Sequence, residues 1–346
     1  MKDLKYLAAF IIPATVIVGL NLRGYWSFLA PVVGFVLIPI LETLLPVDEK
    51  NLSPEEASSK AANVFFDVLL YLNIPLVFGL IGWFLWSLSW AQYSTMELVG
   101  LTFSVGLILG SNGINVAHEL GHRETRISKT LGKLLLLPAL NMHFYIEHNF
   151  GHHVRVGTAE DPASARYNQS LYAFWVVSIP GQYINAWKLQ RDMLKRKGVG
   201  FFSLQNDMLW YTVFQIGYLV AIYALLGGFA TLIAVILGVT AQLLLETINY
   251  IEHYGLSRSK TESGRYERVR EIHSWNSNHV LGRMVLYELT RHSDHHHRAS
   301  KKYQLLDCHE ISPQLPYGYP TSMVLATVPP LWFAIMNKRI PLEMRA

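Results

Sequence analysis

The chain has 346 residues, of which 51% are hydrophobic and 16% are charged, and its mean hydropathy is +0.23. This composition is too apolar for an ordinary soluble domain and favours a membrane protein. A single cysteine, Cys308, excludes a disulfide within the chain and excludes cysteine-ligated iron sites, so any redox partner must be a separate protein. The net charge of +4 does not indicate nucleic-acid binding, because the cations are not clustered with aromatic residues in a soluble domain.

Six apolar stretches are long enough to cross a bilayer as helices, which takes about 20 residues. They cover approximately residues 6–22, 26–45, 65–88, 97–116, 209–226 and 229–245. The first is predicted to be a helix rather than a cleaved signal peptide, because a second apolar run follows at once. The predicted fold class is therefore an all-α integral membrane protein, with one domain over residues 1–346 and six transmembrane helices.

The basic residues predict which side of the membrane each segment faces. Lysine and arginine are absent from residues 61–122 and 198–257 and concentrate in 188–197, 258–270 and 291–302. By the positive-inside rule these basic segments face the cytoplasm. We therefore expect two cytoplasmic histidine-rich segments, 117–208 and 250–346, and cytoplasmic termini.

Two further apolar stretches do not fit a simple span. Residues 131–144 are short and contain Pro138, so we expect a buried or re-entrant segment. Residues 171–187 carry Trp175, Tyr183 and Trp187, which favours a position in the membrane interface.

Fourteen histidines occur in the chain, and nine of them form four clusters. The clusters are His118 and His122 in HELGH, His148, His152 and His153 in EHNFGHH, His253 in NYIEHYG, and His292, His295 and His296 in RHSDHHH. On a helix, residues four apart share one face, so each multiple cluster can aim at least two rings at one point. A zinc ion takes four ligands, so nine imidazoles suit two metal ions better than one.

Imidazole binds iron, copper and zinc, but the lack of cysteine ligands argues against structural zinc and blue copper. Histidine sites beneath an apolar helix bundle favour two non-haem iron ions and oxygen chemistry. The HELGH segment also satisfies the HExxH pattern of zinc peptidases, in which Glu119 would be the general base. A metal transporter is less favoured, since transporters place ionisable groups near the bilayer midplane.

In a di-iron site, nearby carboxylates would instead hold the ligand imidazoles by hydrogen bonds. The candidates for this outer role are Glu119, Glu147, Asp161, Glu252 and Asp294, with His273 and His279 as possible further donors. Any of these acids is otherwise a solvated surface carboxylate. The isolated His143 and His309 are predicted to be solvated.

The four histidine clusters resemble, in order and spacing, those of the integral-membrane alkane 1-monooxygenases, the AlkB-type hydroxylases. The likeness extends to DPAS at 161–164, SWNSNH at 274–279 and LPYGYP at 315–320, and covers about residues 5–335. The NYIEHYGL segment separates this family from desaturases and fatty-acid hydroxylases. His297 departs from the family pattern, but His296 keeps its four-residue spacing from His292.

This resemblance implies a bacterial inner-membrane enzyme that hydroxylates the terminal methyl of medium-chain n-alkanes with O2. Its electrons would come from rubredoxin, reduced by an NADH-dependent rubredoxin reductase. The nine clustered histidines would be the iron ligands. A membrane fatty-acid hydroxylase or desaturase, or a xylene-type methyl hydroxylase, is the nearest alternative.

The bound partners follow from this chemistry. An alkane has no polar group, so a tunnel between the spans would bind it by apolar burial, worth about 0.8 kcal/mol per methylene. Basic residues near the clusters would suit docking of an acidic rubredoxin, or would anchor the topology. These are Arg123, Lys133, Arg155, Arg258 and Arg291.

Overall fold

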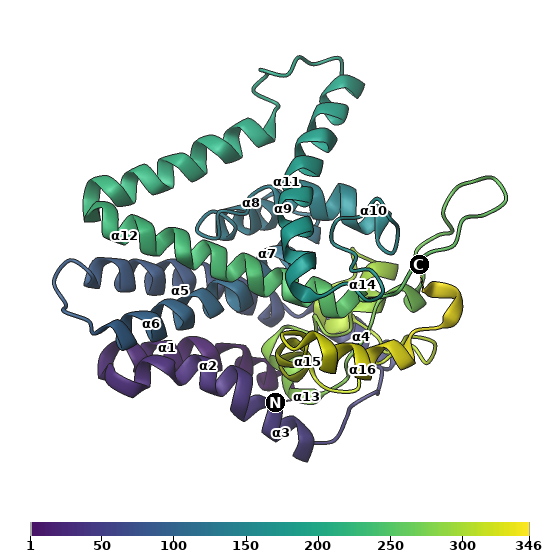
Figure 1. The fold of residues 1–346 in the computed structure, drawn as a ribbon, viewed down its shortest axis with the longest axis horizontal. Coiled ribbons are helices and arrows are strands. Elements are labelled where there is room, and N and C mark those ends of the chain that lie inside the picture. Colours follow the sequence, from purple (N-terminus) through teal and green to yellow (C-terminus); the bar gives the residue numbers. More distant parts are fainter. Residues whose placement is uncertain (1, 346) are drawn as a thin grey trace.

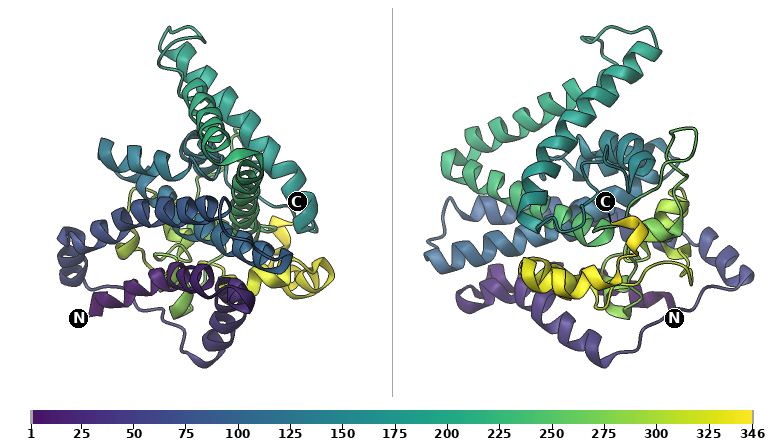
Figure 2. Two further views of the ribbon diagram at one scale, coloured as in Figure 1. Left: turned by 90° about the vertical axis from the view of Figure 1, so that its left-hand side faces the viewer. Right: turned by 45° about the vertical axis from the view of Figure 1, so that its right-hand side comes forward.

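The computed structural model describes residues 2–345, and this part of the chain is helical, with three isolated β-bridges and no sheet. The all-α prediction is confirmed. Figures 1 and 2 show α1, α5, α6 and one arm of α12 side by side, with the C-terminal helices gathered at one end of them.

The longer helices are α1 (Ile11–Leu22), α5 (Phe65–Ser87), α6 (Thr95–Ile108), α8 (Arg126–Leu135), α11 (Leu171–Arg196) and α12 (Asp207–His253). The shorter ones are α2 (Leu29–Val32), α3 (Ile38–Leu44), α4 (Pro54–Ala62), α7 (Asn115–His122), α9 (Phe144–Glu147), α10 (His153–Arg155), α13 (Val280–Val285), α14 (His292–His297), α15 (Tyr319–Ala326) and α16 (Pro329–Met336). Three π-helical segments interrupt the α-helices, namely η3 (Val33–Leu37), η4 (Leu109–Ile114) and η5 (His148–His152).

Five helical stretches in the described residues are long and apolar enough to cross a membrane. They are Asp3–Leu22, Gly24–Leu44, Phe65–Ser87, Thr95–His122 and Asp207–His253. Large apolar side chains on these helices are exposed, including Leu72 at 49% and Leu232 at 54%, which suits contact with lipid. The chain is an integral membrane protein, and the first four predicted spans each lie largely within one of these stretches.

The predicted fifth and sixth spans both fall within α12. Gly227 interrupts the helical backbone there with φ 82° and ψ 177°, a conformation that glycine adopts without a side-chain clash. Two arms of α12 diverge from a sharp bend in Figure 1. By helix length the structure has five candidate spans rather than six, and a sixth separate crossing stays a prediction.

The helix that carries HELGH begins with a capping box. The Ser94 hydroxyl accepts the Glu97 N–H, and the Glu97 carboxylate accepts the Ser94 N–H, so the first turn of α6 is satisfied. The helical run continues through η4 into α7. In η4, the Asn112 amide donates to Asn73 Oδ1 at 2.8 Å and to the Ala9 carbonyl at 3.0 Å, which ties this helix to α5 and to the N-terminal segment.

The apolar stretches 131–144 and 171–187 are not among the candidate membrane spans. α8 ends at Leu135, and the chain then turns with Leu136 and Ala139 almost fully buried, as expected for a buried segment in 131–144. Residues 171–187 form the first part of α11. Their position relative to a membrane interface stays a prediction.

Close packing of α6 on α12 depends on Gly106. A Cβ at this position would lie 2.7 Å from Cγ2 and 2.8 Å from Cβ of Thr240, and the Cβ of Thr240 cannot move without the backbone. The missing side chain therefore lets the two helices approach closely.

Gly106→Ala is expected to lower the free energy of unfolding by about 1–3 kcal/mol, the usual cost of overpacking. The matched control is Gly82→Ala on α5, where a Cβ meets nothing within 4 Å and a gain of about 0.5–1 kcal/mol is expected. Thermal denaturation of both variants in one detergent would measure the difference. Equal melting temperatures would contradict this account of the contact.

Candidate metal centre

The nine clustered histidines lie in two neighbouring groups. The first group contains His118, His122, His148, His153 and His295, and the second contains His152, His253, His292 and His296. Within each group the candidate ligand atoms all lie within 4.8 Å of one another. Four distant parts of the chain therefore meet at one place.

The π-helical segment η5 explains how EHNFGHH serves both groups. A π-helix bonds each residue to the fifth one along, so positions i and i+5 come close together on one face. His148 and His153 accordingly share the first group, with Nε2 atoms 3.0 Å apart, while His152 joins the second. Sequence spacing alone had left open which pair shares a metal.

The other clusters sit on α-helices and follow the four-residue spacing. His118 and His122 on α7 share the first group, and His292 and His296 on α14 share the second. His295 lies between the last two in sequence but turns to the first group. α12 contributes its last residue, His253.

The Nε2 atoms of the first group fit a metal ion. His295 Nε2 lies 2.9 Å from His118 Nε2 and 3.1 Å from His153 Nε2. Two imidazole nitrogens bound at right angles to one ion, each at about 2.1 Å, lie about 3.0 Å apart. The lone pairs of these Nε2 atoms repel one another, so a metal cation bound among them would stabilise the arrangement.

The second group has the same character. The Nε2 of His292 lies 2.9 Å from that of His296 and 3.3 Å from that of His253. His152 completes the group, and its buried Nε2 has no hydrogen-bond partner among the described residues. An unsatisfied buried acceptor is costly, and a bound ion would satisfy it.

Burial also keeps these rings ready for a metal. It lowers the pKa of His148, His153 and His295 well below the ordinary value, and the neighbouring imidazoles lower it further. Metal ligation requires neutral imidazole. These three rings are therefore in the ligating form at neutral pH without having to lose a proton. His152 differs: burial lowers its pKa, but the Asp161 carboxylate outweighs burial and raises the pKa above the ordinary value.

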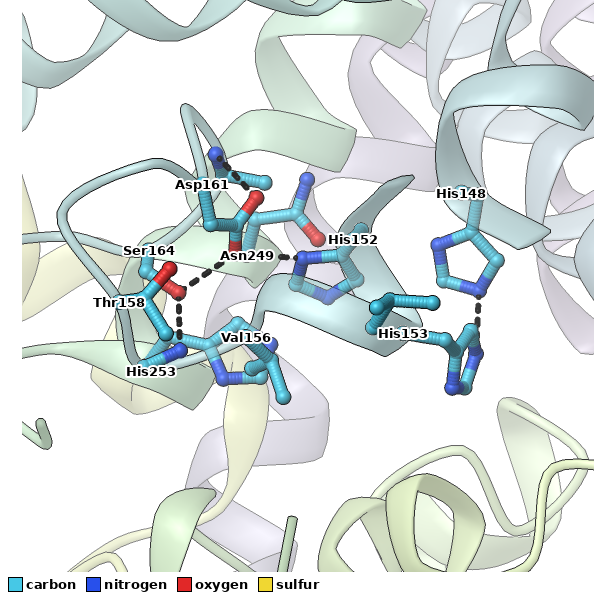
Figure 3. Close-up of polar contacts among 12 residues, drawn as sticks. His148, His152, His153, Val156, Thr158, Asp161, Ser164, Asn249 and His253 are labelled. Atoms are coloured by element: carbon cyan, nitrogen blue, oxygen red, sulfur yellow. Dashed lines mark hydrogen bonds and ion pairs between the residues drawn. The ribbon is translucent and has the colours of Figure 1, made fainter. Parts of the chain in front are cut away.

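Asp161 holds one ring of the second group in place. Its Oδ2 accepts the Nδ1–H of His152 at 2.8 Å, and Figure 3 shows the carboxylate between His152 and Ser164. Ser164 and the Ala163 N–H donate to the same carboxylate. With Nδ1 carrying the proton, Nε2 is left as the ligand atom.

Glu252 lies at the metal-facing side of the second group. Its Oε2 is 3.1 Å from His292 Nε2, and its Oε1 accepts the Tyr319 hydroxyl at 2.9 Å. Both residues line the apolar cavity described below. This carboxylate oxygen is close enough to the Nε2 atoms to face a bound ion.

The other residues predicted for an outer role make different contacts. Glu119 pairs with Arg123 and accepts the Tyr303 N–H, and Glu147 accepts from the Asn185 amide. Asp294 binds Lys301, the Asp307 N–H and His309. His279 lies beside Ser277, and His273 hydrogen-bonds His253 through its backbone while its ring accepts the Arg270 N–H.

One histidine expected to be solvated is buried, and His297 lies apart. His143 is 8% exposed, packs on Tyr183, and has its pKa lowered by burial to about 4. The prediction of a solvated side chain is therefore wrong for His143, whereas the His309 side chain is 30% exposed and contacts Asp294 at 2.8 Å. The structure places His296 in the second group and His297 outside both groups, near Glu271.

Two of the predicted docking cations are also buried. Arg123 pairs with Asp67 and Glu119, and Arg291 is 2% exposed and donates to backbone carbonyls. They stabilise the fold, so the docking prediction is wrong for both. Lys133, Arg155 and Arg258 are also engaged in contacts but remain partly exposed.

An apolar cavity opens between the helices and reaches both groups. Its walls include Ile12, Leu107, Phe144, Leu245 and Leu286, and its metal end includes His118, His148 and His292. A long apolar ligand here would end at the histidines.

Residues that the motifs did not single out complete the site. Tyr319 donates to Glu252, and Ser274 Oγ lies 3.3 Å from His253 Nδ1. Phe144 stacks on His148, with ring centroids 4.6 Å apart. Tyr319 and Ser274 lie in the LPYGYP and SWNSNH segments, so those segments were the available signal for them.

Comparison with known proteins agrees with this site. Residues 94–325 match the fatty acid desaturase family model. Alkane 1-monooxygenase 2 of Pseudomonas aeruginosa is 39% identical over 93% of this chain and 86% of its own length. Alkane 1-monooxygenase 2 of Alcanivorax borkumensis is 38% identical over 98% of this chain and 91% of its own length.

The chain belongs to the alkane 1-monooxygenase family. The hydroxylase component of a xylene/toluene monooxygenase from Pseudomonas putida is also similar, but at 27% identity over 98% of this chain. The family of alkane 1-monooxygenases and the two histidine groups identify the chain as an enzyme of membrane di-iron type. They do not support a peptidase built on HELGH alone.

Asp161→Asn is expected to weaken metal binding in the second group by about 10–100-fold, because an amide N–H facing His152 Nδ1 would move the ring proton to Nε2. Metal content after dialysis against graded chelator measures this. The control is Asp192→Asn, an exposed carboxylate on α11 that pairs with Arg191. Retention of both ions by the Asp161 variant at wild-type chelator concentrations would contradict the assigned role.

Proposed function

We propose that this protein is a non-haem di-iron monooxygenase that converts medium-chain n-alkanes to 1-alkanols with O2, using electrons from rubredoxin. The observation that carries the proposal is the meeting of two all-histidine groups with one apolar cavity. Iron bound in the two groups would supply the activation of O2 and the oxidation of the terminal methyl.

The nine histidines would hold the two ions, five around one and four around the other. Asp161 orients His152, and the backbone of His273 orients His253. Glu252 presents a carboxylate oxygen beside His292, held by Tyr319. These contacts fix the ligand atoms before substrate arrives, which limits the reorganisation needed for reaction.

The cavity provides binding and exclusion of water. Burying an alkane stabilises it by about 0.8 kcal/mol per methylene, so affinity grows with the length of chain that fits. Two of the polar side chains in the cavity bond to backbone groups: Ser111 donates to the Leu107 carbonyl and Asn115 donates to the Leu286 carbonyl. A dry cavity that ends at the histidines suits attack on a terminal methyl.

Glu119 disfavours the zinc-peptidase alternative. In a zinc peptidase the glutamate of HExxH faces the metal-bound water as general base. Here Glu119 Oε1 lies 2.9 Å from Arg123 and accepts the Tyr303 N–H. A fatty-acid or xylene-type substrate is a closer alternative, and product analysis on alkane, fatty ester and xylene would distinguish the three.

The proposed electron donor is a separate protein because the chain has one cysteine and cannot build a rubredoxin-type site. Two surface clefts flank residues 157–166, and the exposed Arg166 lines both. One cleft also contains exposed Lys188 and Asp161, which bonds His152. An acidic rubredoxin docked in this cleft would lie beside Asp161, which is hydrogen-bonded to the proposed metal ligand His152.

The proposed orientation places this face in the cytoplasm of a bacterial cell, with the chain as one domain in the inner membrane. The basic segments 188–197, 258–270 and 291–302 support it by the positive-inside rule. Rubredoxin and its NADH-dependent reductase would then meet the enzyme on the same side.

The purified protein is expected to contain two irons per chain and to convert octane to 1-octanol when rubredoxin, its reductase and NADH are supplied. His295→Ala should lower this activity at least about 100-fold, because it removes a ligand of the first group. The control is His297→Ala, which removes a neighbouring imidazole outside both groups. Full activity in the His295 variant, or one zinc per chain, would reject the proposal.

Arg166→Glu is expected to raise the KM for rubredoxin about tenfold at low salt and leave kcat nearly unchanged, since charge reversal acts on association. Steady-state kinetics at several salt concentrations measures the effect. Arg126→Glu is the control, because Arg126 is exposed on α8 and lines neither cleft. An equal KM change in both variants would place docking elsewhere.

A further inference from the structure

A polar surface cleft lies where α11 ends and α12 begins. Its lining includes Lys197 at the end of α11, Asp207 at the start of α12 and Lys133 on α8. Gln190 and Gln205 add amide groups to the same lining. This hollow, called here the lysine cleft, shares no lining residue with the apolar cavity that reaches the histidines.

The ammonium group of Lys133 is held in position at this cleft. Its Nζ donates to Asp207 Oδ2 at 3.1 Å and lies 4.4 Å and 5.4 Å from the ring centroids of Tyr145 and Tyr211. An ammonium has three donors, so the contact with Asp207 leaves donors for a further oxygen atom. Because the side chain is already ordered, a ligand that binds it loses less free energy to the ordering of a long, flexible group.

The lysine cleft carries a net positive charge. Its two lysines, Lys133 and Lys197, outnumber Asp207, the acid in the lining. Lys197 is exposed, and Lys195 and Arg196 are exposed beside it at the end of α11. Lysine is a common partner of phosphate, so a group with one negative charge and several oxygen acceptors, such as a phosphate diester, complements this cleft.

Apolar surface begins directly beside the cleft. Trp210 and Phe214 lie three and seven residues after Asp207 on α12, so they share a helix face with it. Their rings stack with centroids 5.8 Å apart, and the two residues are 40% and 49% exposed. Phe202, in the loop between α11 and α12, is 88% exposed. A ligand anchored in the cleft would therefore have apolar aromatic surface next to it.

The cleft also lies at the end of a candidate membrane span. Asp207 is the first residue of the span Asp207–His253. In Figure 1, α11 runs across the direction of α5 and α6, and the first arm of α12 returns from the end of α11 at an angle. With α12 embedded in a bilayer, the cleft is at the depth of the lipid headgroups, and the following turns of α12 meet the acyl chains.

We propose that the lysine cleft binds the headgroup of an anionic phospholipid of the phosphatidylglycerol type, with the acyl chains along Trp210 and Phe214. The phosphate diester accepts from Lys133 and Lys197, and the uncharged glycerol lies near the Gln205 amide. A zwitterionic headgroup binds less well, because it brings an ammonium group against the lysines and like charges repel. The bound lipid joins α8, α11 and the start of α12, and this role does not depend on the proposed hydroxylation of alkanes.

Native mass spectrometry of the purified protein in detergent, titrated with dioleoyl phosphatidylglycerol or dioleoyl phosphatidylcholine, tests the site. The wild-type protein is expected to bind phosphatidylglycerol about tenfold more tightly, and Lys197→Glu should remove most of this difference. The matched control is Lys195→Glu, because Lys195 is an exposed cation of the same helix end that does not line the cleft. Equal affinity for the two lipids in the wild type, or an equal loss in both variants, would overturn the proposal.

Inorganic phosphate distinguishes a lipid site from a site for a soluble anion. Millimolar phosphate is not expected to displace phosphatidylglycerol, because the acyl chains contribute apolar contacts that phosphate lacks. Thermal denaturation gives a second measurement, in which phosphatidylglycerol should raise the Tm of the wild type more than that of Lys197→Glu. Displacement of the lipid by phosphate, or an equal rise of Tm in the wild type and in Lys197→Glu, would overturn the assignment to a phospholipid.

Discussion

The structure depends on one constraint, the convergence of nine histidine side chains in two neighbouring groups. Eight of their Nε2 atoms lie 2.9–3.3 Å from another Nε2, a spacing that is repulsive for bare lone pairs and suitable around cations. The remaining fold serves to bring four distant segments to this point. His118 and His122 lie on α7 and His253 is the last residue of α12, whereas η5 and α10 carry His148, His152 and His153, and α14 carries the remaining three.

Local changes of helical period connect the membrane helices to the site. η4 lies between α6 and HELGH, η5 lies within EHNFGHH, and η3 carries Phe35 at the wall of the cavity. A π turn rotates everything beyond it relative to what precedes it, and such turns recur at functional sites. The apolar helices can therefore pack for stability while the side chains beyond each π turn face the site.

Several features of the fold and the site could be predicted from the sequence, because the length of an apolar run and the spacing of histidines are local properties. The first four spans and the convergence of the clusters belong to this class. The division of His152 from His153 was not predictable, since it depends on a π turn that leaves no periodic signal. Burial of Arg291 and the pairing of Glu252 with Tyr319 depend on residues far away in the chain, which spacing cannot show.

The adjacent pair His152 and His153 divides between the two groups, and so does the pair His295 and His296. Each pair connects the two histidine groups through a single peptide unit, because its two residues are neighbours in the chain. Binding of a metal ion in one histidine group would therefore also order two side chains of the other group. We accordingly expect the two metal positions to fill cooperatively. Molecules loaded with metal under limiting supply should then be found either empty or full, with few carrying a single ion.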